Sequence, residues 1–235
     1  MLFVFLTKRE GKDMAKLIKL LVAFVGLALI ALPAQAYEKG DWIFRAGWGM
    51  VDPDNPVANF TDDVGDSLFI DVDSGSALTL EGVYFFSPNW SFEVLAATPF
   101  KHDVKLGASL DGQAGTAKIG EVSHLPPTFT FQYHFMPDAA FRPYVGLGLN
   151  WTIFFDEELV PELTDEGLSL DVDDSFGVAV QLAADVPLGD KWLLNFDVRW
   201  MQIEADATLS DGIESDVVTL DISPLVYSIN LGYRF

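Results

Sequence analysis

The sequence predicts an all-β fold, an eight-stranded antiparallel transmembrane β-barrel of the outer-membrane type. Apolar residues alternate with smaller or polar residues through eight segments of about 10 residues. One face of each segment is large and apolar, whereas the other mixes Gly, Thr, Asn, Gln and charged side chains. Such a mixture suits a narrow polar lumen and cannot form a compact apolar core. Aromatic residues gather near the segment ends, as in the girdles of membrane barrels.

The composition excludes several classes of protein. The chain has 235 residues, of which 35 are acidic, 14 are basic and none is cysteine, and its net charge is -21. The aromatic content of 13% argues against a disordered acidic tail, and the negative charge argues against a nucleic-acid partner. A chain without cysteine has neither a disulfide scaffold nor a thiolate-ligated metal. We expect one sizeable domain without a cofactor.

A secretory signal is expected at the N-terminus. Lys16 and Lys19 precede an unbroken apolar run, Leu20–Leu32, and the segment ends at Ala36 in the small-x-small sequence AQA. The run has 13 residues, whereas about 20 are needed to span the hydrocarbon core, so a membrane helix is disfavoured. We therefore expect cleavage between Ala36 and Tyr37.

The predicted signal divides the chain into two parts. Residues 1–36 form the signal peptide, in which 1–13 are an extension without a structural role, and residues 37–235 form a single β-barrel domain. The mature part holds 33 acidic and 9 basic residues. Its sequence has no further apolar run long enough for a membrane helix. A membrane-embedded form must therefore use strands.

The first predicted strand illustrates the alternation. Its large members include Trp42, Phe44, Trp48 and Met50, and Arg45 lies on the opposite face. The same period recurs along the chain. The eight predicted strands are 42–50, 77–86, 92–97, 127–135, 142–155, 176–186, 192–200 and 225–235.

The connections between these strands have two lengths. Three short turns alternate with four long loops. Short periplasmic turns and long extracellular loops are typical of outer-membrane barrels, so we expect the outer membrane of a Gram-negative bacterium, with both termini in the periplasm. The turns are 87–89, 136–140 and 187–191, and the loops are about 51–76, 101–124, 156–174 and 202–219.

Acidic residues concentrate in three of the long loops. Loops 51–76, 156–174 and 202–219 hold 21 of the 33 carboxylates of the mature chain. None of them contains the spaced ligand pattern of an EF-hand calcium loop. The pattern therefore favours a solvated acidic surface over a dedicated metal site. Weak divalent bridges to the phosphates of outer-membrane lipids are the alternative.

A charged plug is expected inside the barrel. An eight-stranded barrel leaves room for little besides side chains or one small ligand. Because buried charges need partners, we expect Arg45 and Arg199 to pair with Glu81, Glu93 or Asp197. The simplest interpretation is a polar plug in the periplasmic half, and the functional alternative is a gate. The polar residues that the alternation directs inward are Arg45, Glu81, Glu93, Gln132, His134, Gln181, Asp185, Asn195, Asp197 and Arg199.

Prolines interrupt the predicted wall near the outer mouth. Pro99, Pro126 and Pro127 cannot donate ladder hydrogen bonds, so they mark strand ends or a local opening. Phe100 and Leu125 are their apolar neighbours. An opening at these residues would give a hydrophobic solute an exit to the bilayer.

An enzymatic site is not expected. Ser123, His124 and His134 are the candidates for nucleophile and base chemistry, and the sequence shows no spaced nucleophile, base and orienting group. A histidine in a lumen is more often hydrogen-bonded filler than a catalyst. We therefore predict a barrel that is not an enzyme.

Four motifs resemble those of the OmpW family. The motifs are LAATPF at 95–100, HLPPT at 124–128, RPYVGLGLN at 142–150 and GYRF at 232–235. The resemblance implies an eight-stranded barrel with a narrow, partly hydrophobic interior that passively takes up small hydrophobic molecules. It also implies sideways release of these molecules through the wall into the bilayer. Tyr233 and Phe235 resemble the C-terminal signal that the outer-membrane assembly machinery recognises.

One inward position departs from the family pattern. The resemblance implies an apolar and an aromatic residue that constrict the path, and Leu95 faces inward by the alternation. The seventh-strand position aligned with Leu95 holds Arg199. This departure argues against a purely hydrophobic gate.

Two functions therefore stand as hypotheses. The first is a conduit for small hydrophobic solutes. Apolar residues near the outer mouth support it, namely Phe60, Leu68, Phe69, Phe100, Leu125 and Phe154. The second is a structural or surface-interaction barrel without a transport path, whose acidic extracellular loops engage lipopolysaccharide, a host or a phage.

Overall fold

A computed structural model of the chain describes residues 35–61, 67–110 and 113–235. Apart from Gln35 and Ala36, the predicted signal peptide lies outside these described residues. Within them, no helix is both long and apolar enough to cross a bilayer.

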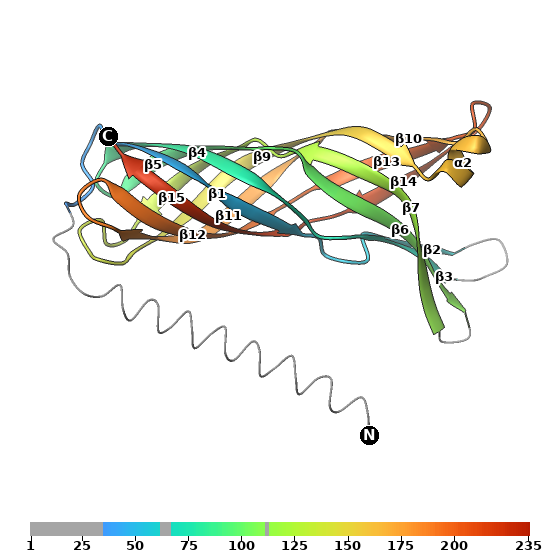
Figure 1. Cartoon of the computed structure of the whole chain (residues 1–235), viewed down its shortest axis with the longest axis horizontal. Coiled ribbons are helices and arrows are strands. Elements are labelled where there is room, and N and C mark those ends of the chain that lie inside the picture. The colour runs from blue at the N-terminus through green and yellow to red at the C-terminus, as the bar shows by residue number, and fades with distance from the viewer. Residues whose placement is uncertain (1–34, 62–66, 111–112) are drawn as a thin grey trace, which may run out of the picture.

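The described chain forms a closed antiparallel barrel of eight strands, which confirms the predicted fold (Figure 1). Each strand pairs with its neighbours in the ring, and the first pairs with the last, with Arg45 opposite Gly232. Ring closure gives each strand a partner on both sides, so the wall itself satisfies backbone groups inside the membrane. The strands are β1 (Trp42–Asp52), β4 (Gly75–Ser87), β5 (Trp90–Ala97), β8 (Thr128–His134), β9 (Arg142–Leu159), β11 (Ser175–Pro187), β12 (Trp192–Met201) and β15 (Leu225–Arg234).

The short turns and both described chain ends lie at one end of the barrel, at the left in Figure 1. The turns are 88–89, 135–141 and 188–191. The backbone N–H of Phe235 donates to the carbonyl of Trp42 at 2.9 Å, which joins the two ends of the barrel sequence. Because outer-membrane barrels have short periplasmic turns, we call this the periplasmic end and the opposite one the outer end.

An apolar belt surrounds the eight strands. Leu147 on β9 and Leu182 on β11 lie in its middle, and both side chains are exposed. Exposed tryptophans lie at both edges of the belt, as expected for residues at the two membrane interfaces. They are Trp42, Trp90 and Trp192 toward the periplasmic end, and Trp48, Trp151 and Trp200 toward the outer end.

The four segments expected to be loops are instead largely strands. They extend the wall past the outer girdle, where β6 pairs with β3 and β7, and β7 pairs with the outer half of β9. The strands β10, β13 and β14 form a separate three-stranded sheet. The elements are β2 (Ala58–Thr61), β3 (Ser67–Val72), β6 (Phe100–Leu110), β7 (Gln113–Leu125), α2 (Pro161–Asp165), β10 (Ser169–Val172), β13 (Glu204–Ser210) and β14 (Ser215–Asp221).

The polarity of the wall reverses between the belt and this extension. On β12, Trp200 faces outward and the neighbouring Arg199 is buried. On β13, which follows directly, Glu204 and Asp206 are exposed and Ala205 is buried. The outer strands therefore keep the two-residue period but turn their apolar side inward, because water replaces lipid outside them.

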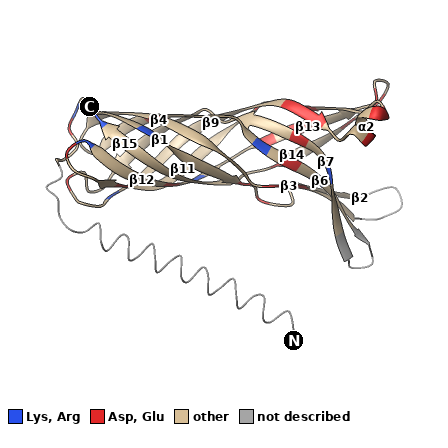
Figure 2. Cartoon of the chain, in the orientation of Figure 1, with Lys and Arg blue, Asp and Glu red and all other residues tan. Residues whose placement is uncertain are grey.

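The outward polar face of the extension is acidic. Figure 2 shows carboxylates around α2, β13 and β14 at the outer end. Three of the acidic residues assigned to this surface, Asp62, Asp63 and Asp66, lie outside the described residues. The charge pattern of the described part fits an outer end that is surrounded by water.

A charge introduced into the belt should destabilise the barrel. Leu147→Arg places a guanidinium in the middle of the belt, at a side chain that is 63% exposed, and the expected cost is about 2–4 kcal/mol of unfolding free energy. Urea unfolding in lipid vesicles measures it. Ile213→Arg, in the turn between β13 and β14, is the control with little expected change. Equal stabilities of the two variants would contradict the position of the belt.

Candidate functional site

A buried ion network fills the periplasmic half of the lumen. The Arg45 guanidinium donates to Glu81 Oε2 at 3.1 Å through Nη1, to Glu93 Oε2 at 3.0 Å through Nη1, and to Asp185 Oδ2 at 2.9 Å through Nη2. All four side chains are fully buried. They come from β1, β4, β5 and β11, so one guanidinium links four strands across the interior.

A second arginine extends the network. Arg199 Nη2 donates to Glu93 Oε1 at 2.6 Å and approaches Asp197 Oδ2 at 3.4 Å. Two amides supply further donors, since Gln132 Nε2 donates to Glu93 Oε2 at 2.6 Å and Gln181 Nε2 donates to Asp197. The arginines therefore share their carboxylates with uncharged donors, as buried ion pairs require when their remaining lone pairs leave water.

Tyr37 is buried at the periplasmic end of the lumen. Its hydroxyl donates to Asp185 Oδ2 at 2.6 Å, and the Arg142 guanidinium lies 4.3 Å from the centre of its ring. His134 lies beside it. The His134 ring stacks on Tyr144 with 4.5 Å between the ring centres, and its Nε2 lies 3.0 Å from Ser91 Oγ. The sequence did not predict that Tyr37 enters the barrel.

Nine of the ten polar residues that the alternation directs inward join one network: Arg45, Glu81, Glu93, Gln132, Gln181, Asp185, Asn195, Asp197 and Arg199. The tenth, His134, and the apolar Leu95 lie on either side of it. Leu95 belongs to the apolar cluster on its outer side, and His134 belongs to the aromatic group at the periplasmic end. Ala36 is half-buried, and Tyr233 and Phe235 lie on and just after β15.

An apolar chamber lies beyond this ion network, which forms the plug predicted from the sequence, and inside the extended wall. Its outer part has a volume of about 350 Å³ and its inner part a volume of about 40 Å³. Val104, Val122, Val172 and Leu220 line both parts, so the two adjoin. Volumes of roughly 300 Å³ and more are typical of small-molecule sites. Sequence reasoning missed these residues because it assigned their segments to loops.

The predicted mouth residues divide between the chamber and its surroundings. Phe60 lines the outer part and Phe154 the inner part. Phe100 is buried and its ring stacks on His124, with 5.4 Å between the ring centres. The remaining candidates, Leu68, Phe69 and Leu125, are not among the residues that line either part.

The wall is interrupted beside Phe100. Leu95 pairs with Thr128 and Phe100 pairs with His124, and between these two pairs the described strands form no ladder. Pro99 lies in the gap on one side, and the gap on the other side contains Pro126 and Pro127. A Cβ atom built on Gly49 of β1 would lie 3.7 Å from Phe100 Cζ, so the ring of Phe100 extends across the lumen behind this gap.

A comparison with known protein families identifies the family of this chain. A model of the OmpW family matches residues 38–235. The chain belongs to the OmpW family.

Individual relatives match most of the chain. Outer membrane protein W from Vibrio cholerae serotype O1 is 42% identical and covers 88% of this chain and 94% of its own. The crystal structure of OprG from Pseudomonas aeruginosa has a TM-score of 0.76 at 36% identity, covering 86% of this chain and 99% of its own. The dibenzothiophene metabolism operon protein PahQ, also from Pseudomonas aeruginosa, is 25% identical and covers 89% of this chain and 95% of its own. Like outer membrane protein W and OprG, this OmpW-family chain is an outer-membrane barrel.

Loss of the central arginine should destabilise this OmpW-family barrel. Arg45→Ala leaves Glu81, Glu93 and Asp185 buried without their shared cation, and the expected cost is about 3–5 kcal/mol of unfolding free energy. Urea unfolding in lipid vesicles measures this cost.

The half-exposed pair of Lys105 with Asp73, at 2.5 Å, provides a matched control. Lys105→Ala should cost at most about 1 kcal/mol, because water screens an exposed pair. An Arg45→Ala variant as stable as Lys105→Ala would show that the network does not hold the strands together.

Proposed function

We propose that the protein is a passive conduit for small hydrophobic solutes, which enter the chamber from the outer end and leave sideways into the bilayer. The observation that carries this proposal is the position of an apolar chamber directly above a closed, charged plug. Residues from β3, β6, β7, β10 and β14 line the chamber, whereas Arg45 and Arg199 fill the lumen below it.

The plug makes a straight path unfavourable. A solute that moved on to the periplasm would separate Arg45 and Arg199 from buried carboxylates, and each broken pair leaves an uncompensated charge away from water. Lipid lies on the other side of the wall and is favourable for an apolar molecule. The lower-energy exit from the chamber therefore leads through the wall.

The interrupted ladder supplies the place for that exit. Residues Pro99, Pro126 and Pro127 leave fewer hydrogen bonds to break between the strands. Phe100 stands behind the gap, so movement of its ring connects the chamber to the lipid. The name of the PahQ relative supports the class of solute, because dibenzothiophene is an apolar aromatic compound.

The remaining assignments follow from the same barrel. We propose that it has no enzymatic activity, that its outer surface lies against lipid and lipopolysaccharide, and that Tyr233 and Phe235 are recognised by the assembly machinery. We propose cleavage between Ala36 and Tyr37, which leaves Tyr37 as the first residue of the mature chain. Mass spectrometry of protein purified from outer membranes tests the cleavage site, and any other N-terminus would contradict it.

Filling the chamber should stop uptake. Val104 lines both parts of the chamber, so Val104→Trp should reduce uptake of radiolabelled naphthalene to the rate of cells without the protein. Lys101→Trp is the matched control, because Lys101 lies on the same strand and its side chain is 65% exposed. Uptake is measured in a Gram-negative strain that lacks its own family member.

The same assay separates the two hypotheses. Acidic side chains at the outer end favour the alternative of a surface-interaction barrel (Figure 2). That alternative predicts equal uptake by Val104→Trp, Lys101→Trp and cells without the protein. Uptake by the unmodified protein and Lys101→Trp, but not by Val104→Trp, supports the conduit.

A further inference from the structure

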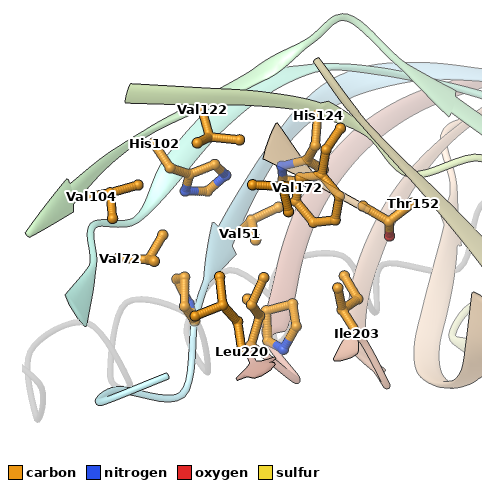
Figure 3. Close-up of a pocket in the computed structure, with 14 residues that line it drawn as sticks. Val51, Val72, His102, Val104, Val122, His124, Thr152, Val172, Ile203 and Leu220 are labelled. Carbon is orange, nitrogen blue, oxygen red and sulfur yellow. The ribbon is translucent and has the colours of Figure 1, made fainter. Parts of the chain in front are cut away.

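Two histidines lie side by side at the inner end of the chamber. His102 on β6 and His124 on β7 stack with 4.9 Å between ring centres and 17° between ring planes (Figure 3). Each residue is only 5% exposed. The rest of the lining is apolar apart from Thr152, whose hydroxyl donates to Asn150 Oδ1 at 2.6 Å. The imidazoles are therefore the polar feature of this part of the chamber.

Both histidines carry a nitrogen without a hydrogen-bond partner. In the described part of the chain, nothing pairs with Nε2 of either ring, and both atoms are buried. Buried polar atoms normally have partners. The third histidine, His134 in the plug, also has one buried unpaired nitrogen, Nδ1, while its Nε2 lies 3.0 Å from Ser91 Oγ. His102 and His124 differ from it in lining an apolar cavity large enough for a solute.

The protein fixes the hydrogen-bonding character of His102. Its Nδ1 lies 2.6 Å from the backbone carbonyl of Asp73. Because a carbonyl only accepts, Nδ1 of a neutral ring carries the proton and Nε2 presents a lone pair. Burial lowers the pKa of His102, and burial lowers the pKa of His124 to about 3, so both rings are neutral at physiological pH.

The lack of a side chain at Gly75 leaves room for the His102 ring. A Cβ atom built on Gly75 would lie 2.7 Å from Cε1 and 2.9 Å from Nε2 of His102. Any side chain at position 75 would therefore displace the imidazole. A metal ion does not account for the pair, because no third metal-ligating side chain gathers with it in the described ranges.

We propose that His102 and His124 recognise the hydroxyl group of an uncharged, otherwise apolar solute, such as a phenol or a medium-chain alcohol. This inference rests on the proposed conduit and specifies its solute. Small rotations of both rings bring the buried Nε2 atoms to the chamber surface. The hydroxyl then donates to the lone pair of His102 Nε2, and its oxygen accepts from His124 in the tautomer protonated at Nε2. The apolar body of the solute occupies the wider part of the chamber, between Val104 and Leu220.

The same geometry discriminates against two other classes of solute. A hydrocarbon fills the chamber but leaves both Nε2 atoms unpaired. A carboxylate would bring a charge into a chamber whose inner lining has no charged side chain among the described residues, and its desolvation is costly. An uncharged hydroxyl compound is therefore the class that satisfies the inner end of the chamber.

Binding of matched compounds tests the inference. Protein labelled with ¹⁵N at its histidines, in lipid nanodiscs, is titrated with 4-ethylphenol or with ethylbenzene, which lacks only the hydroxyl. We expect 4-ethylphenol to shift the His102 Nε2 resonance upfield, whereas ethylbenzene leaves it unchanged. His134 is an internal control, since it lies in the plug and should respond to neither compound.

Affinity provides a second readout. His102→Phe keeps an aromatic ring but removes the acceptor, so it should weaken 4-ethylphenol binding roughly tenfold and leave ethylbenzene binding unchanged. Equal affinities of the unmodified protein for both compounds, with naphthalene uptake intact, would overturn hydroxyl recognition and leave the conduit standing. Failure of both compounds to bind, together with no uptake, would overturn both proposals.

Discussion

The buried pairing of Arg45 with three carboxylates is the interaction on which the rest of the structure depends. A ring of eight strands satisfies the backbone in lipid, but it encloses an interior that side chains must fill. Here the filling is ionic, and Glu81, Glu93 and Asp185 reach Arg45 from three different strands. The network links strands across the diameter of the barrel and fills the lumen on the periplasmic side. The route that we propose for a solute therefore lies above the network.

A second constraint is the change of medium along the barrel. The same alternation runs through the whole wall, but lipid surrounds the belt and water surrounds the extension. Leu147 therefore faces outward in the belt, whereas Leu220 faces inward in the extension. The inversion creates an apolar chamber at the outer end of a barrel whose lumen is polar. Prolines at this boundary, including Pro99 and Pro126, interrupt the strands where the lipid-facing belt meets the water-facing extension.

The sequence predicted the part of the structure that lipid constrains. Strong contrast between the two faces of each strand was enough to place all eight strands and to direct Arg45 and Glu93 inward. Two features were missed. Tyr37 precedes β1, so its contact with Asp185 depends on how this segment folds back into the lumen, which alternation does not specify. Val104 and Leu220 lie in or beside segments rich in charged residues, where the apolar side is narrower and the exposed charges suggest loops.

The central claim is that apolar solutes bind in the chamber above the plug. Crystals of the protein soaked with a brominated naphthalene test it most directly, because anomalous scattering locates the bromine without reference to any activity. The account predicts a bromine peak inside the outer wall, between Val104 and Leu220. A peak within the periplasmic half of the lumen, among Arg45 and its carboxylates, would contradict it.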